Sequence, residues 1–468
     1  MLLKQTKLNN NSLLLFSIVI KLRFKSQNEY NSLITQIYTI PKRIAFFAIF
    51  VLMKNLLSLL IVIALASCSE NHGKQEESSP LLALVEGDWL LEFHITETNN
   101  APVNLIITKK DTTYEVVFIN ASEKIKAQEV VIEGDNISIH DPLFNTWFEG
   151  KIVNATRIEG QWFKDNREYT IPFTARHGKM ARFRKPTKLK ESDSNVSGKW
   201  EVDFSNNNPE DHYKAIGQFQ QVDDYVTGTF MTETGDYRYL EGNMYNNNLY
   251  LSCFDGAHIF LFKATLVNNK LTGAFWSGAH WEEPWVASKN ETFTLSNPDS
   301  LTYLKEGFDK LSFTFPNTKG DSISLADEKY QDKVVIVNIM GPWCPNCKDE
   351  TAYLAELYNK YHDKGLEIIA LSFDKSEEFD AAAANILKIK AHFGANYDFL
   401  IAGKANKIAA AEALPMLNHI MSYPTSIFID RKGNIKKIRT GFYGPGTGSY
   451  YTQYVEQTND LIGKLLAE

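Results

Sequence analysis

The C-terminal fold of this chain is decided by residues 333–350, Lys333-Val334-Val335-Ile336-Val337-Asn338-Ile339-Met340-Gly341-Pro342-Trp343-Cys344-Pro345-Asn346-Cys347-Lys348-Asp349-Glu350. The apolar run 334–340 predicts a central buried strand. Behind the cysteines, apolar residues recur at helical spacing until Gly365 ends the pattern. Cys344 is therefore expected where a strand passes into a helix with one buried face.

The segments around this core alternate between strand and helix patterns, which is typical of a sheet covered by helices. Residues 313–325 predict a hairpin, and residues 367–373 a further strand. Helices are expected over residues 376–393 and 406–413, because Gly394 and Pro415 follow them. Residues 426–429 and 434–440 predict a second hairpin, and the apolar spacing from Tyr451 to Leu465 predicts a last helix.

A lone Cys-x-x-Cys pair is a weak signal, but the ordered set of strand, Trp-Cys-x-x-Cys, helix and Tyr423-Pro424-Thr425 resembles TlpA/ResA-type thioredoxin-like domains. The resemblance implies an α/β domain over residues 299–468, with a central mixed sheet and helices on both faces. It implies that Pro424 is a cis-proline, and that Trp343, Tyr423 and Pro424 contact substrate. Two positions depart from the usual thioredoxin pattern, since Asn338 replaces a buried Asp and Ala352 replaces a helix-kinking proline.

The position of the two cysteines predicts different chemical roles for them. Cys344 at a helix N-terminus lies where free N–H groups and the helix dipole favour a thiolate, so it is expected to be the exposed nucleophile. Cys347, one turn further in, is expected to be buried and to resolve the mixed disulfide. Since Pro345-Asn346 supplies no cation, we expect a reductant rather than a strong oxidant. No cofactor is expected.

Glu350 has two interpretations of equal weight. It matches the acidic residue that ResA-like proteins carry near the dithiol, where it could transfer a proton to or from Cys347. A solvated acid in the first turn of a helix is equally consistent with the position, because the helix dipole alone favours it.

The region before the thioredoxin-like domain predicts an all-β fold, with short β-branched and aromatic runs between turn residues. Gly87-Asp88-Trp89 recurs as Gly198-Lys199-Trp200, an offset of 198 − 87 = 111 residues, and the late strand near Gly160 recurs near Gly273 at 273 − 160 = 113. We therefore expect two repeated meander or barrel-like modules, residues 86–178 and 197–298.

The basic linker between the modules, residues 179–196, is interpreted as solvated. Cys253 is expected to be a buried thiol without a redox role. The main alternative function is that the β region binds a ligand or partner and the dithiol domain is accessory to it.

The N-terminal sequence predicts a bacterial lipoprotein. Residues 53–67 have the charge, apolar core and small residues of a signal peptide, and Leu65-Ala66-Ser67-Cys68 forms a lipobox in which Cys68 would carry the lipid. A transmembrane anchor over residues 44–66 is the alternative. Residues 1–52 are interpreted as a mis-assigned extension, and 68–85 as a tether.

Composition limits the remaining function classes. A net charge of −7 argues against a nucleic-acid surface, and four cysteines are too few for a disulfide-stapled scaffold of 468 residues. No second ligand pair completes a metal site, and Lys348 stands where haem attachment needs His. Gly341 replaces the Thr expected in a peroxiredoxin. The expected partners are oxidised substrate proteins and a membrane or periplasmic electron donor, with the chain lipid-anchored on the periplasmic side of a membrane.

Overall fold

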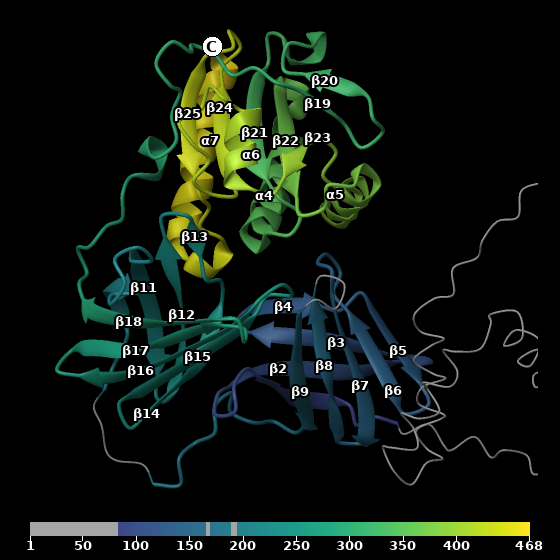
Figure 1. Cartoon of the computed structure of the whole chain (residues 1–468), viewed down its shortest axis with the longest axis vertical. Coiled ribbons are helices and arrows are strands. Elements are labelled where there is room, and N and C mark those ends of the chain that lie inside the picture. Colours follow the sequence, from purple (N-terminus) through teal and green to yellow (C-terminus); the bar gives the residue numbers. More distant parts are fainter. Residues whose placement is uncertain (1–82, 165–168, 189–193) are drawn as a thin grey trace, which may run out of the picture. The chain divides into compact units, whose positions relative to one another are not determined.

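The structure is a computed structural model that describes residues 83–164, 169–188 and 194–468 (Figure 1). Residues 81–468 form one compact unit. The predicted extension, signal peptide and lipidation site at Cys68 lie outside the described residues. In the described part of the chain, no helix combines the length and the apolar character needed to cross a bilayer.

The first module is a nine-stranded antiparallel sheet in the order β4-β3-β2-β1-β9-β8-β7-β6-β5. It curls into a half-barrel, whose end strands β4 and β5 do not pair with each other within the described sheet. The strands are β1 (Gly87–His94), β2 (Asn100–Lys110), β3 (Thr113–Asn120), β4 (Glu123–Lys126), β5 (Glu129–Glu133), β6 (Asn136–His140), β7 (Thr146–Asn154), β8 (Arg157–Lys164) and β9 (Tyr169–His177).

The second module is a closed antiparallel barrel in the order β11-β10-β18-β17-β16-β15-β14-β12, with β11 pairing β12 to complete the circle. Its interior is filled by aromatic side chains, among them Phe204, Phe230 and Phe262. The strands are β10 (Gly198–Phe204), β11 (Tyr213–Val222), β12 (Tyr225–Thr232), β13 (Gly235–Asp236), β14 (Leu240–Tyr245), β15 (Asn248–Phe254), β16 (Ile259–Val267), β17 (Lys270–Ser277) and β18 (Trp281–Lys289).

The predicted repeat is confirmed by the matching strand orders of the two sheets. Each of β1–β9 corresponds to the strand numbered nine higher, so β1 corresponds to β10 and β9 to β18. Every pairing of the first sheet recurs in the second, which has one more, between β12 and β14, that closes the barrel. The two tryptophans of the repeated Gly-x-Trp are buried and equivalent. Trp89 Nε1 donates to the carbonyl of Val85 at 3.0 Å, and Trp200 Nε1 donates to the carbonyl of Val196 at 2.8 Å.

The half-barrel completes its core with a side chain of the barrel. Phe254, at the end of β15, lies 5.3 Å from the Phe93 ring centre and 5.0 Å from that of Phe118, and it also contacts Phe148 and Trp162. A residue of the second module thus belongs to the core of the open first module.

Arg182 contradicts the solvated interpretation of the basic linker. Its side chain is buried, and its guanidinium donates to Glu241 Oε2 of the barrel at 2.8 Å and to the carbonyl oxygen of Ile119 of the half-barrel. A buried guanidinium is stable only when its donors are paired. Arg182 therefore joins the two modules.

The C-terminal domain has the predicted thioredoxin-like architecture, a mixed sheet in the order β23-β22-β21-β24-β25. In β21, Val334 and Ile336 face the cluster formed with α4, α5 and α7, whereas Val335 and Val337 face α6 and the β19–β20 hairpin. The helices and strands are β19 (Thr314–Pro316), β20 (Ser322–Ser324), β21 (Val334–Met340), α4 (Pro345–Tyr361), β22 (Leu366–Asp374), α5 (Phe379–Phe393), β23 (Asp398–Lys404), α6 (Lys407–Ala413), β24 (Thr425–Ile429), β25 (Ile435–Thr440) and α7 (Ser449–Ala467), with short 3-10 turns at Pro298–Ser300, Glu328–Tyr330, His362–Lys364 and Pro445–Thr447.

Two details of this domain differ from the sequence prediction. α5 begins at Phe379 rather than at residue 376, because Ser376 is held in a turn where its backbone N–H donates to Asp374 Oδ1 at 2.9 Å. The edge strand β23 was not predicted, although its residues pair in parallel with β22.

Candidate functional site

Cys344 caps the N-terminus of α4, directly after the central strand. Its Sγ accepts a hydrogen bond from the backbone N–H of Cys347 at 3.2 Å. The backbone N–H groups at a helix start are otherwise unpaired and carry partial positive charge, so they stabilise a sulfur anion at this position. The structure thus places Cys344 at the point where the central strand passes into a helix, as the sequence predicted.

Cys347 lies one turn into α4 and is fully buried. Burial raises the pKa of the Cys347 thiol well above its ordinary value, and interaction with Cys344 raises it further. Both cysteines are free thiols in the structure. Cys347 is thus held as a neutral thiol while Cys344 is reduced.

Glu350 is buried, with 1% of the residue exposed, which excludes the interpretation as a solvated first-turn acid. Its carboxylate accepts hydrogen bonds from Tyr454 Oη at 2.7 Å, Asn338 Nδ2 at 2.6 Å and Ser426 Oγ at 3.0 Å. Burial nevertheless raises the pKa of Glu350. The negative charge of Glu350 in turn raises the pKa of Cys347, one helical turn away on the same face.

The loop before β24 forms the other side of the dithiol. The Tyr423–Pro424 peptide bond is cis, as the resemblance implied. The carbonyl oxygen of Tyr423 lies 3.5 Å from Cys344 Sγ, and the Tyr423 ring meets the Trp343 ring edge-on at 5.5 Å. Trp343 is fixed by a 2.9 Å hydrogen bond from its Nε1 to the carbonyl of Phe373. The structure therefore brings Trp343, Tyr423 and Pro424 together around Cys344.

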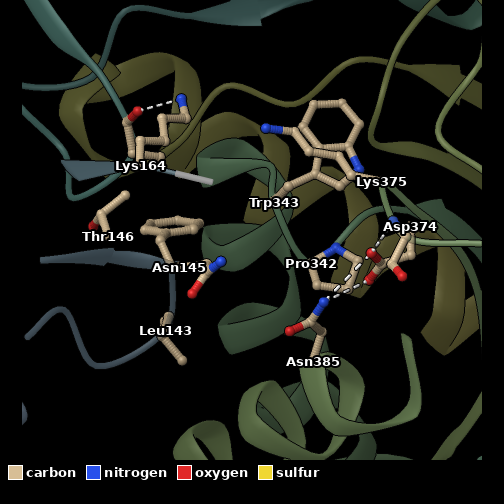
Figure 2. Close-up of a pocket in the computed structure, with 12 residues that line it drawn as sticks. Leu143, Asn145, Thr146, Lys164, Pro342, Trp343, Asp374, Lys375 and Asn385 are labelled. Atoms are coloured by element: carbon tan, nitrogen blue, oxygen red, sulfur yellow. Dashed lines mark hydrogen bonds between the residues drawn. The ribbon is translucent and has the colours of Figure 1, made fainter. Parts of the chain in front are cut away.

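The prediction that Cys344 is exposed is wrong for this structure, since only 6% of the residue is accessible. Leu143 of the half-barrel belongs to the same buried cluster as both cysteines. A cavity of about 350 Å³ lies beside the site (Figure 2). Pro342 and Trp343 line it on the thioredoxin-like side, and Phe144 and Asn145 line it on the half-barrel side.

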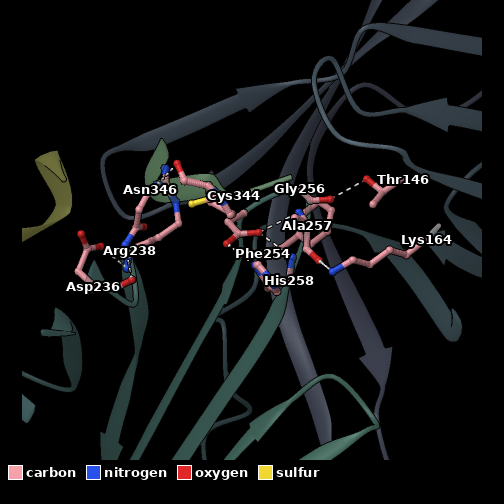
Figure 3. Close-up of polar contacts among 12 residues, drawn as sticks. Thr146, Lys164, Asp236, Arg238, Phe254, Gly256, Ala257, His258, Cys344 and Asn346 are labelled. Atoms are coloured by element: carbon pink, nitrogen blue, oxygen red, sulfur yellow. Dashed lines mark hydrogen bonds and ion pairs between the residues drawn. The ribbon is translucent and has the colours of Figure 1, made fainter. Parts of the chain in front are cut away.

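Arg238 of the barrel was not singled out from the sequence, yet it contacts the active-site helix directly (Figure 3). Its guanidinium binds Asp349 with two hydrogen bonds of 2.5 and 3.2 Å, Glu123 of the half-barrel at 2.6 Å, and the carbonyl of Pro345 at 3.4 Å. Only 2% of the Arg238 side chain is exposed. This residue joins all three modules beside the dithiol.

Cys253 is buried in the barrel, and burial raises the pKa of its thiol well above the ordinary value. A thiol in this state is a poor nucleophile. Its burial agrees with the interpretation as a small apolar residue.

Comparison with known proteins identifies relatives of the C-terminal domain. Residues 309–438 match the AhpC/TSA family model. The thiol-disulfide oxidoreductase ResA of Bacillus subtilis is 30% identical over 138 residues, which are 30% of this chain and 69% of that protein. ResA of Bacillus thuringiensis strain Al Hakam is 36% identical over 124 residues, 26% of this chain and 63% of that protein.

Among solved structures, a thioredoxin-family thiol:disulfide interchange protein of Chlorobium tepidum aligns with 18% identity, 35% of this chain, 98% of its own chain and a TM-score of 0.27. Through this C-terminal domain, the chain belongs to the ResA-type thiol-disulfide oxidoreductase family.

Proposed function

We propose that this protein reduces disulfide bonds of other proteins outside the cytoplasm, using Cys344 as nucleophile and Cys347 as resolving thiol. The observation that carries the proposal is the asymmetry of the pair. Cys344 Sγ accepts from a helix N-terminal N–H group, whereas Cys347 is fully buried and held as a thiol. A dithiol with these two states performs sequential attack and resolution.

The proposed reaction balances in two steps. The Cys344 thiolate attacks one substrate sulfur, forming a mixed disulfide while the other substrate sulfur leaves as a thiolate and takes up a proton. Cys347 then loses its proton and attacks Cys344 Sγ, which releases the second substrate thiol and leaves a Cys344–Cys347 disulfide. The dithiol supplies two electrons, and a dithiol donor at the membrane or in the periplasm restores it.

The direct test is stoichiometric reduction of insulin by the pre-reduced full chain. We expect one insulin disulfide to be reduced for each Cys344–Cys347 disulfide that forms, because Cys253, the other cysteine of the described residues, is buried in the barrel away from this pair. Peptide mass spectrometry of the alkylated products measures the pairing. Insulin left intact, or reduced without a Cys344–Cys347 disulfide, would contradict the proposal.

Glu350 is proposed to accept the proton of Cys347 during resolution. We expect Glu350→Gln to slow resolution at neutral pH by roughly 10²-fold, the effect typical of losing a positioned base, while attack by Cys344 changes little. Rapid mixing with a chromogenic disulfide separates the two phases. Equal resolution rates in the parent and the variant across the pH range would remove Glu350 from the site.

Glu350→Gln should also change how the free energy of unfolding depends on pH. Because the pKa of Glu350 is raised from its ordinary value of 4.5, the folded chain keeps a proton that the unfolded chain releases. The stabilisation by protonated Glu350 is therefore fully present below pH 4.5 and is lost as pH rises through the folded-state pKa. Glu350→Gln should flatten that part of the stability profile.

We also propose that the chain is lipid-anchored at Cys68 on the periplasmic side of a membrane, a position supported by the lipobox at residues 65–68. Such an anchor would hold the dithiol near a membrane electron donor. Mass spectrometry of the mature N-terminus tests this, and a chain that retains Ser67 would contradict it.

A further inference from the structure

A hairpin of the barrel lies on the face of the thioredoxin-like domain that carries the dithiol. We call residues 232–236, the end of β12 with β13, the active-site hairpin. Ser422 Oγ donates to the carbonyl of Thr234 at 2.6 Å, and Tyr443 Oη donates to the carbonyl of Thr232 at 2.9 Å. The backbone N–H of Gly444 donates to Asp236 Oδ2 at 2.7 Å.

These contacts lie on both sides of Cys344. Ser422 directly precedes Tyr423 and Pro424, the residues proposed to contact substrate. On the other side, Asn346, between the two cysteines, donates to the carbonyl of Asp236 at 3.4 Å (Figure 3). An extended peptide that brought its cystine to Cys344 would need the same loop edge and the same helix start. The active-site hairpin already contacts both places, because its backbone carbonyls accept hydrogen bonds from Ser422 and Asn346.

The fit is close enough to require glycine. Gly235 has φ +152°, and a Cβ at this position would lie 2.2 Å from Asn346 Nδ2. Across the contact, Gly441 has φ +75°, and its Cβ would lie 3.0 Å from the carbonyl oxygen of Glu233. A methyl group at residue 235 would therefore displace the Asn346 amide that donates to the hairpin and would strain the backbone at positive φ, which weakens the contact between the hairpin and the motif.

We propose that the active-site hairpin determines substrate size, so that in this docked state the dithiol reacts with small disulfides and a protein disulfide reaches Cys344 only after the hairpin moves away. The inference rests on the proposed reductase function and adds the substrate class that the docked chain accepts.

Two further observations support a size filter rather than a permanent block. The contacts made by the hairpin backbone and by Asp236 are hydrogen bonds, which exchange for water more readily than the buried ion pairs of Arg238, two residues further along the chain. A cavity of about 350 Å³, comparable to the volume of a small-ligand site, is lined by Pro342 and Trp343, the two residues that directly precede Cys344.

The test compares Gly235→Ala with Gly134→Ala in the full chain. Gly134 is a matched control, because it too has positive φ, +64°, in a β-module turn, but nothing lies within 4 Å of its Cβ position. We expect Gly235→Ala to raise kcat/KM for insulin by roughly fivefold or more, since a larger fraction of chains is open. Reduction of a small aromatic disulfide should change less than about twofold in both variants.

A second variant tests the proposal if Gly235→Ala does not fold. A second readout, the labelling of Cys344, tests it if the parent protein has no reductase activity. Tyr443→Phe removes one hydrogen bond to the hairpin and leaves the dithiol untouched. In a Cys347→Ser background, Cys344 is labelled by iodoacetamide or by a maleimide with a long polyethylene glycol chain. Both Gly235→Ala and Tyr443→Phe should raise the ratio of large-reagent to small-reagent rates.

The outcomes separate the two proposals. A parent that reduces neither substrate contradicts the reductase function, while the labelling ratio still reports on the hairpin. A labelling ratio that is the same in the parent and both variants overturns the size filter, as does an equal gain for insulin and the small disulfide.

Discussion

Cys344→Ser is expected to lower disulfide reduction to background, a loss of roughly 10³-fold or more, because a hydroxyl at the α4 N-terminus does not become an anion at neutral pH. Cys347→Ser should behave differently. It retains the attacking sulfur and loses the resolving one, so it should accumulate mixed disulfides between Cys344 and substrate. Non-reducing electrophoresis followed by peptide mass spectrometry measures the trapped species.

Cys253→Ala is the matched control for these variants. Cys253 is buried in the barrel, and burial keeps it a neutral thiol, so its replacement should alter neither turnover nor trapping. Equal trapping by Cys344→Ser and Cys347→Ser would show that position along α4 does not assign the two roles.

Arg238→Ala is expected to lower the free energy of unfolding by about 3–5 kcal/mol, the usual cost of removing one partner from a buried ion pair. The variant leaves the carboxylates of Asp349 and Glu123 at the junction of three modules without their cation. With side-chain exposures of 13% and 11%, neither carboxylate is well compensated by water. Denaturant titration followed by tryptophan fluorescence measures the change.

Arg157→Ala provides the comparison. Arg157 also binds a carboxylate, that of Glu159, but both side chains are nearly half exposed, at 44% and 45%. Exposed ion pairs contribute about 0–1 kcal/mol, so this variant should be nearly neutral. If Arg238→Ala costs no more than Arg157→Ala, the network around Arg238 does not hold the modules together.

The sequence predicted the parts of the fold that local patterns determine. The run 334–340, the helix behind Cys344 and the repeated Gly-x-Trp each carry their signal within a few residues, and each was found as expected. The edge strand β23 was missed because it lies between two helices without a turn signal of the kind that marks a hairpin.

The parts of the site that sequence reasoning missed depend on partners distant in the chain. Glu350 is buried because Tyr454, 104 residues later, donates to its carboxylate, and a first-turn glutamate looks the same in sequence whether or not such a donor exists. Arg238 and Arg182 resemble surface residues until the acids of other modules surround them. The low exposure of Cys344 has the same origin, since Leu143 of the half-barrel joins its cluster.

The Phe254 ring inside the half-barrel has a consequence for the order in which the protein matures. The last strand of the half-barrel ends at His177, and Phe254 follows 254 − 177 = 77 residues later. At a synthesis rate of roughly 5–20 residues per second, Phe254 is made about 4–15 s after the last strand of the first module. During that interval its aromatic face lacks a cover, so this is the stage at which a nascent chain would need protection from aggregation.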